Sequence, residues 1–255
     1  MRVIDLSSPI DARNWEPEPL SHTVLSPGEA ALHMSEEMLK HFGVRFDPAV
    51  LPDCELLSID TLTLTSHTGT HIDAPAHYGT RASYGEPKTV EQLPLDWFHR
   101  PAFVLDLTDH GTGAVDADVI KAELDRIDYH PEPLDIALLN TGADALAGTP
   151  AFFTDFTGLD ASAVDLLLDL GVRVIGTDAF SLDAPFLDMI KRYQASGDAD
   201  VLWPAHFLGR DREFCQIERL AALGSLPPHG FTLSCFPVKI HGAGAGWTRA
   251  VALLD

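Results

Sequence analysis

The chain has 255 residues, of which 17 are basic and 38 acidic, so its formal net charge at pH 7 is −21. A surface this acidic repels phosphate backbones and anionic lipids, so we expect neither nucleic-acid nor membrane partners. The length fits one domain spanning residues 1–255, and a hydrophobic fraction of 45% can supply a substantial core.

Cysteine usage and hydropathy together indicate the compartment. Cys54, Cys215 and Cys235 are far apart and match no CxxC spacing, which favours reduced thiols over disulfides or catalytic nucleophiles. No apolar stretch has the length of a signal peptide or a membrane span. We therefore expect a cytoplasmic protein.

The first predicted element is a strand over residues 2–6, and it is followed by a segment of different character at 26–52. Pro27-Gly28 opens this segment, a helical patch covers residues 35–42, and Leu51-Pro52 closes it. The segment precedes a candidate active site, where it could form a lid or an oligomer contact. Ordinary surface packing is an equal alternative.

From residue 56 onward, short apolar runs alternate with helical patterns. Ile120, Leu124 and Ile127 repeat at helical spacing after a candidate cap at Asp116 or Asp118, and a second helix over 164–170 ends before Gly171. Strands are predicted over 56–64, 102–107, 135–139, 172–175, 231–236 and 249–253. The mixture predicts an α/β fold whose strand order stays open.

The chemistry lies in the stretch SHTGTHIDAPAH at 66–77, which holds three of the twelve histidines and one aspartate. Imidazole and carboxylate groups are the ligands of zinc and similar divalent ions. A helix would place His67 and His71 on one face but turn Asp73 almost the opposite way. Gly69 and Pro75 also disfavour a helix here.

A straight strand is excluded as well, because about 3.3 Å per residue would separate His67 from His71 by roughly 13 Å. The chain must therefore bend at Gly69-Thr70, where glycine permits a tight turn. We expect a strand before this turn and an extended run from Asp73 to His77 after it. His77 would then lie beside the metal as an acid/base without being a ligand.

The stretch matches HxGTHxDxPxH, and the chain thereby resembles the cyclase-like metal-dependent hydrolases, which include bacterial kynurenine formamidase and isatin hydrolase. Further similarity covers IDLS at 4–7, NTG at 140–142, VIGTDAFSLD at 174–183 and GWTRA at 246–250. Trp247 and Thr248 depart from the family's closing turn. The resemblance implies a swivelling β/β/α single domain and a homo-oligomer, either a dimer or a tetramer.

The resemblance also implies a set of metal ligands. His67, His71 and Asp73 would hold a first divalent ion, zinc or manganese. Asp73 would bridge to a second ion held by His206 and Glu218, a pair twelve residues apart. One or two ions per chain are therefore expected.

Other residues in the matching segments are given supporting roles. Trp15 lies near the place where formamidases carry a substrate-contacting aromatic residue, although it could equally be a core anchor. Asp178, Ser181 and Asp183 are expected to orient ligands or to close turns.

These expectations favour a metal-dependent hydrolase of a C–N bond in a small amide, formamide, lactam or imide. Metal-activated water would attack the carbonyl, with His77 moving the proton. One alternative is a metal-dependent cyclase or lyase acting on a biosynthetic intermediate such as a polyketide. Another is a non-catalytic metal-binding protein, which His77 argues against, because an acid/base beside three ligands leaves the coordination sphere open.

Overall fold

The computed structural model describes residues 1–254. The chain divides into two compact units, one made of Met1–Trp15 with Ser66–Asp255 and the other of Glu16–Thr65. All the predicted site residues belong to the larger unit. The predicted segment 26–52 lies inside the smaller unit, which begins earlier and ends later than the sequence indicated.

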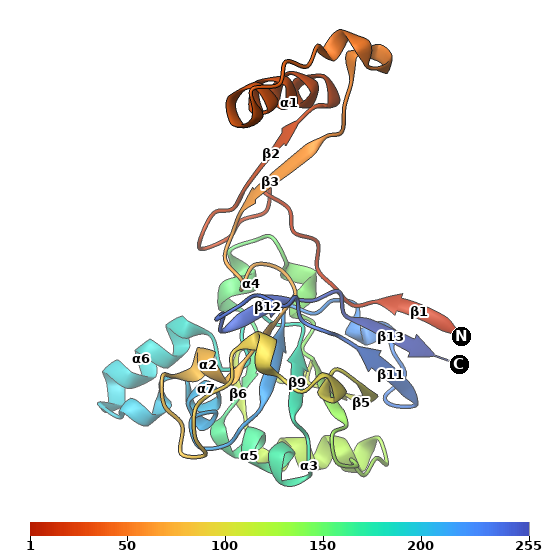
Figure 1. Ribbon diagram of the computed structural model, residues 1–255. Helices are drawn as coiled ribbons and strands as arrows, with labels where there is room; N and C mark the ends of the chain where they lie inside the picture. The colour runs from red at the N-terminus through yellow and green to blue at the C-terminus, as the bar shows by residue number, and fades with distance from the viewer. Residues whose placement is uncertain (255) are drawn as a thin grey trace. The chain divides into compact units, whose positions relative to one another are not determined.

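The smaller unit is a pair of strands that carries a helix between them (Figure 1). The strands β2 (Ser21–Leu25) and β3 (Ile59–Thr63) pair antiparallel. The helix α1 (Pro27–Phe42) starts eight residues before the predicted helical patch, because Ser26 and Glu29 form a capping box at its first turn. The short 3₁₀ turns Pro48–Val50 and Pro52–Cys54 follow it.

The larger unit is built on a mixed sheet of nine strands within residues 1–254. Its centre is parallel, in the order β5-β7-β9-β10, and antiparallel strands extend it on both sides. The nine strands, in sheet order, are β1 (Arg2–Asp5), β13 (Val251–Leu254), β11 (Phe231–Ser234), β5 (His99–Asp106), β7 (Ile136–Asn140), β9 (Val174–Thr177), β10 (Cys215–Glu218), β4 (His71–Asp73) and β12 (Ala245–Trp247). A separate parallel pair consists of β6 (Gly113–Val115) and β8 (Thr157–Leu159).

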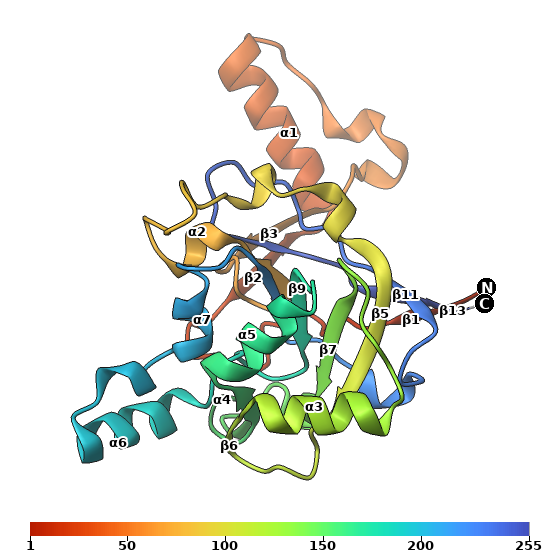
Figure 2. The same ribbon diagram turned by 90° about the horizontal axis from the view of Figure 1, so that it is seen from below.

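Both faces of the central strands are buried, which explains their continuous apolar runs. The helices α3 (Ala117–Arg126) and α5 (Ala161–Asp169) cover one face (Figure 2) and pack on side chains such as Phe103 and Leu139. The other face packs on the loops and antiparallel strands through side chains such as Val104 and Leu138. The remaining helices are α2 (Pro75–Tyr78), α4 (Ala151–Thr154), α6 (Phe186–Ser196) and α7 (Pro204–Leu208).

Both helix predictions after residue 100 are confirmed together with their ends. Asp116 caps α3 by accepting hydrogen bonds from the amides of Asp118 and Val119. Gly171 follows the end of α5 with a φ of +94°, a backbone conformation that glycine adopts without strain.

Each predicted strand has a counterpart in the structure, but the sequence missed β2 and the short strands β4, β6, β8, β10 and β12. The short strands have only three or four residues, and β4 and β10 contain His, Asp, Gln and Glu, so they show no clear apolar alternation. Their extended form depends on pairing with strands that are distant in sequence. Cys54, Cys215 and Cys235 are free thiols within residues 1–254. None of the helices in this range is long and apolar enough to cross a membrane.

Candidate metal centre

The turn predicted at Gly69 is present and brings the first two histidines together. Gly69 has a φ of +69°, and the rings of His67 and His71 lie 4.9 Å apart between centroids. The facing atoms, His67 Nδ1 and His71 Nε2, are separated by 3.2 Å. The strand expected before Gly69 is β3, which ends at Thr63, so His67 itself lies in the turn and not in the strand.

The extended run expected from Asp73 to His77 is wrong beyond Ala74. The chain forms the one-turn helix α2, with Pro75 at its first position, where a missing N–H and a fixed φ are favourable. The turn shortens the path, so His77 Nε2 comes within 3.9 Å of Asp73 Oδ2. A straight run of four residues would have separated their backbones by roughly 13 Å.

Strand pairing places further polar residues opposite the motif. β10 and β4 are antiparallel neighbours, with Glu218 paired to His71 and Gln216 paired to Asp73. Directly paired residues project to the same face of a sheet, so all four side chains lie on one face. Glu218 Oε2 consequently lies 3.6 Å from His71 Nε2.

His206 reaches the same place from α7, and its ring is held by an aspartate. His206 Nδ1 lies 2.5 Å from Asp183 Oδ2, and Asp183 also accepts hydrogen bonds from the amides of Ala205 and His206. This fixes the ring so that Nε2 points to Glu218 Oε1, 3.7 Å away. Asp183 therefore orients a candidate ligand, as the sequence suggested.

The first three predicted ligands form a triangle that fits a divalent ion. Asp73 Oδ1 lies 2.9 Å from His67 Nδ1 and 3.4 Å from His71 Nε2. Ligand atoms of a tetrahedral zinc site, each about 2.0–2.1 Å from the ion, are roughly 3.3 Å from one another. His71 Nδ1 lies 2.9 Å from the carbonyl of Gly69, so the neutral ring turns the lone pair of Nε2 toward Asp73. Converging lone pairs on a buried carboxylate and two imidazoles fit a cation.

Two overlapping ligand groups share Asp73. One consists of His67, Asp73 and His77, and the other of His71, Asp73 and Glu218, and in each group the ligand atoms lie within 4.8 Å of one another. The structure thus gathers every predicted metal residue around Asp73. The division of these residues into ligands of a first ion, ligands of a second ion and an acid/base stays a prediction.

The electrostatics of the cluster also favour a cation. Burial and the neighbouring carboxylate of Asp73 raise the pKa of Glu218. Burial would raise the pKa of Asp73 too, but the imidazoles of His71 and His67 hold it well below its usual range. Burial would lower the pKa of His206, whereas the hydrogen bond with Asp183 and nearby carboxylates raise it to about 9. A divalent ion would offset the repulsion between the buried carboxylates.

His77 differs from the other histidines of the cluster. Burial, together with the neighbouring imidazoles, lowers the pKa of His77 to about 4, against the attraction of Asp73. The ring is therefore neutral at pH 7 and can accept a proton. About a third of its side chain remains exposed, so the ring has a route to solvent or substrate.

Trp15 lies at one end of a chain of aromatic rings. Its ring centroid is 6.1 Å from that of Phe153, which in turn lies 4.8 Å from Phe180. The guanidinium of Arg219, next to Glu218 in the chain, lies 4.3 Å from the centre of the Phe180 ring. The aromatic cluster consists of Trp15, Phe153, Phe180, Phe186, Trp203 and Phe207. Trp15 is 41% exposed, which is compatible with the predicted contact to substrate.

Sequence reasoning missed Gln216, a fully buried residue in the middle of the cluster. Its amide nitrogen lies 3.0 Å from Asp73 Oδ2, 2.6 Å from His206 Nε2 and 3.3 Å from Glu218 Oε1. The signal that could have found it is strand alternation, since a residue two before Glu218 in an extended chain faces the same side.

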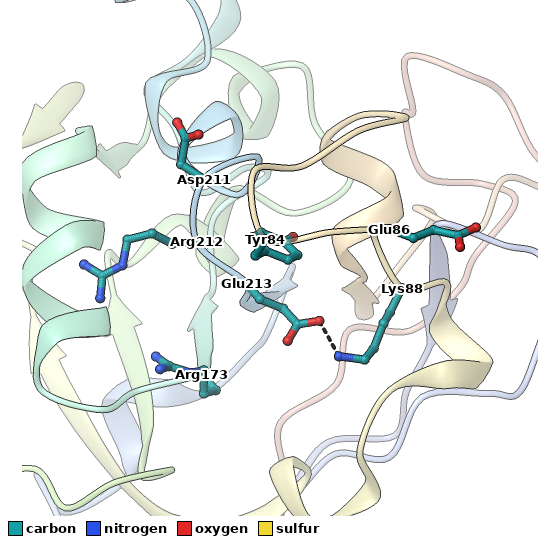
Figure 3. Close-up of a pocket in the computed structure, with 7 residues that line it drawn as sticks. All are labelled: Tyr84, Glu86, Lys88, Arg173, Asp211, Arg212 and Glu213. Carbon is teal, nitrogen blue, oxygen red and sulfur yellow. Dashed lines mark hydrogen bonds and ion pairs between the residues drawn. The ribbon is translucent and has the colours of Figure 1, made fainter.

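A cavity of about 400 Å³ lies elsewhere on the larger unit (Figure 3). It is lined by Tyr84, Glu86, Lys88, Arg173, Asp211, Arg212 and Glu213, none of which is a predicted site residue. Lys88 Nζ and Glu213 Oε1 pair across it at 2.5 Å. Its charges compensate one another, and it offers no cluster of metal-ligating type.

A family model described as "Putative cyclase" matches residues 4–184. This range includes the whole stretch from His67 to His77 and covers more than half of the sequence. The protein therefore belongs to this cyclase family, and the resemblance inferred from the HxGTHxDxPxH motif is confirmed.

Known relatives agree with this assignment. A kynurenine formamidase of Maricaulis maris (strain MCS10) is 29% identical over 206 residues, covering 78% of this chain and 82% of the relative. An isatin hydrolase bound to the product analogue thioisatinate superposes with a TM-score of 0.74 at 22% identity, covering 99% of this chain and 92% of that chain. A potential metal-dependent hydrolase with cyclase activity gives a TM-score of 0.65 at 19% identity, covering 100% and 98%. The solved structures establish the cyclase-like α/β fold that the resemblance predicted.

Proposed function

We propose that the protein is a metal-dependent hydrolase that cleaves a C–N bond of a small amide, formamide, lactam or imide. The observation that carries the proposal is the triangle of His67, His71 and Asp73 with the neutral ring of His77 beside it. The names of the relatives, kynurenine formamidase and isatin hydrolase, support an amide-type bond as the substrate.

In this mechanism His67, His71 and Asp73 would hold the ion, zinc or manganese. When bound, a divalent ion supplies Lewis acidity and lowers the pKa of water in the site. His77 Nε2 accepts the proton of the attacking water and returns it to the leaving nitrogen. His206, fixed by Asp183, and Glu218 complete the polar wall of the site.

The aromatic cluster supports a flat, apolar substrate. Trp15 and Phe207 are each 41% exposed, so the cluster presents ring surface on which a substrate ring can stack. Phe207 follows the site residue His206 directly in α7. We assign Trp15 to substrate binding on this basis, with no role in proton transfer.

The first expected result concerns turnover. With added zinc or manganese, the protein should hydrolyse at least one compound among N-formyl anilines, cyclic imides and isatin-like lactams. In ¹⁸O-labelled water, the new carboxylate should contain one labelled oxygen, because hydrolysis incorporates one water oxygen. Product mass spectrometry measures this, and His71→Ala serves as the inactive control.

The second candidate, a metal-dependent cyclase or lyase, is supported by the family description and by a relative said to have cyclase activity. In that reaction His77 would move a proton next to a carbonyl, and no water would be added. Turnover of a substrate without incorporation of the label would favour this candidate. Complete inactivity on the whole panel would count against the amide hydrolase.

We also propose a homo-oligomer, supported by exposed apolar side chains on α1. Leu32, Leu39 and Phe42 lie along one side of this helix and are 60%, 47% and 72% exposed. Light scattering should give a mass that is a multiple of 27.7 kDa, and the double variant Leu39→Glu/Phe42→Glu should lower it. A wild type that is monomeric at micromolar concentration would refute the proposal.

A further inference from the structure

Gln216 stands at the point where the resemblance places a second metal ion. The three atoms nearest its amide nitrogen are a carboxylate oxygen of Asp73, the imidazole Nε2 of His206 and a carboxylate oxygen of Glu218, at 3.0, 2.6 and 3.3 Å. These are the same three residues that would hold the second ion. One amide group thus contacts the complete second ligand set.

The direction of the amide follows from the chemistry of its neighbours. Asp73 and Glu218 present carboxylate oxygens, which are acceptors, to the amide nitrogen of Gln216. An NH₂ group in this place donates to both carboxylates, whereas the amide oxygen would meet their lone pairs. Gln216 Oε1, on the far side, is buried and accepts no hydrogen bond from residues 1–254. A buried orphan acceptor is unfavourable, so the contacts of the NH₂ group determine the orientation.

The backbone fixes the direction in which the Gln216 side chain projects. Its pairing with Asp73 in the β10–β4 ladder fixes the face to which the side chain projects. The residue is 0% exposed, so the amide cannot turn out into solvent without local opening of the sheet. Cys215 and Ile217, its neighbours in β10, are also fully buried and belong to the apolar core.

The formal charge of the two buried carboxylates matches that of a single divalent ion. The carboxylates of Asp73 and Glu218 carry two negative charges in a buried site, and one divalent cation balances them. A second divalent ion would leave a buried excess of positive charge, whereas the neutral amide of Gln216 adds none.

We propose that the Gln216 carboxamide occupies the second metal position, an inference that rests on the metal site of the proposed function. The chain then binds one ion, at His67, His71 and Asp73. Gln216 is a positioning residue: its NH₂ group donates to Asp73 Oδ2 and Glu218 Oε1 and lies against His206 Nε2, in the place of an ion.

Metal stoichiometry tests this without reference to activity. The wild type, purified without chelator, is incubated with excess zinc or manganese, desalted and measured by inductively coupled plasma mass spectrometry. We expect one ion per chain. Gln216→Ala opens the position and should bind close to two, while Gln216→Met fills the space and should stay at one. Gln194→Ala, an exposed substitution on α6, is the matched control and should also stay at one.

The possible outcomes separate the two proposals. Two ions per wild-type chain would overturn the role of Gln216 and leave the metal-dependent hydrolase intact. No ion in the wild type would overturn both. If Gln216→Ala does not fold, isothermal titration of the wild type still decides the count. A Gln216→Ala variant that folds and binds only one ion would show that the amide does not keep the second ion out.

Discussion

Replacement of His77 by alanine should lower turnover by about 10²- to 10⁴-fold, the usual contribution of a general acid–base group, while metal content stays close to that of the wild type. The physical reason is the separation of roles around Asp73. The Nε2 atom of His77 lies 3.9 Å from Oδ2 of Asp73, whereas His67 and His71 face the other carboxylate oxygen, Oδ1. Steady-state kinetics and elemental analysis on the same preparation measure both quantities.

A matched control for this variant is His130→Ala. His130 is exposed in the turn between α3 and β7, so its loss should change neither turnover nor metal content. If His77→Ala loses its metal, His77 is a ligand, in keeping with the group that it forms with His67 and Asp73. Another residue would then have to move the proton.

Replacement of Asp73 by asparagine should empty the site. Asp73 is the residue common to both ligand groups, so its replacement removes a carboxylate from each of them. Glu218→Gln should retain more metal, because Glu218 belongs to only one of the two ligand groups, with His71 and Asp73. Elemental analysis after dialysis should rank metal content as wild type, then Glu218→Gln, then Asp73→Asn.

Thermal stability gives an independent measurement of the same site. A free ion at about 100 times its dissociation constant stabilises the folded state by about 2.7 kcal/mol. For a chain of this size that corresponds to a rise in melting temperature of roughly 5–10 °C. Chelation should therefore lower the wild-type melting temperature and leave that of Asp73→Asn unchanged. Equal shifts in the two proteins would mean that Asp73 is not a ligand.

Local sequence was sufficient to predict the bend that brings His67, His71 and Asp73 together within seven residues. A helix would turn Asp73 away from the two histidines and a straight strand would separate the histidines, so the motif predicted a bend. The structure has that bend at Gly69, with a φ of +69°. The same reasoning failed at His77. Pro75 was read as the end of extended structure, although proline is equally suited to the first turn of a helix.

The rest of the site depends on contacts between residues far apart in sequence. Glu218 and Gln216 face His71 and Asp73 only because β10 pairs with β4 in one register, and a shift of one residue would turn both away. His206 was assigned by resemblance, but its orientation comes from Asp183, on a different loop. Nothing in the composition of either segment encodes these pairings.

The sequence by itself determined the α/β class, the helices α3 and α5 with the N-cap of the first and the glycine after the second, and the bend between His67 and His71. Each of these depends on periodicity, capping or backbone preference over fewer than about twenty residues, where local energies dominate. The tertiary structure decided the strand order, the separate Glu16–Thr65 unit and the presence of Gln216 among the candidate metal ligands. These depend on long-range strand pairing and burial, whose energies are set by partners that local sequence does not specify.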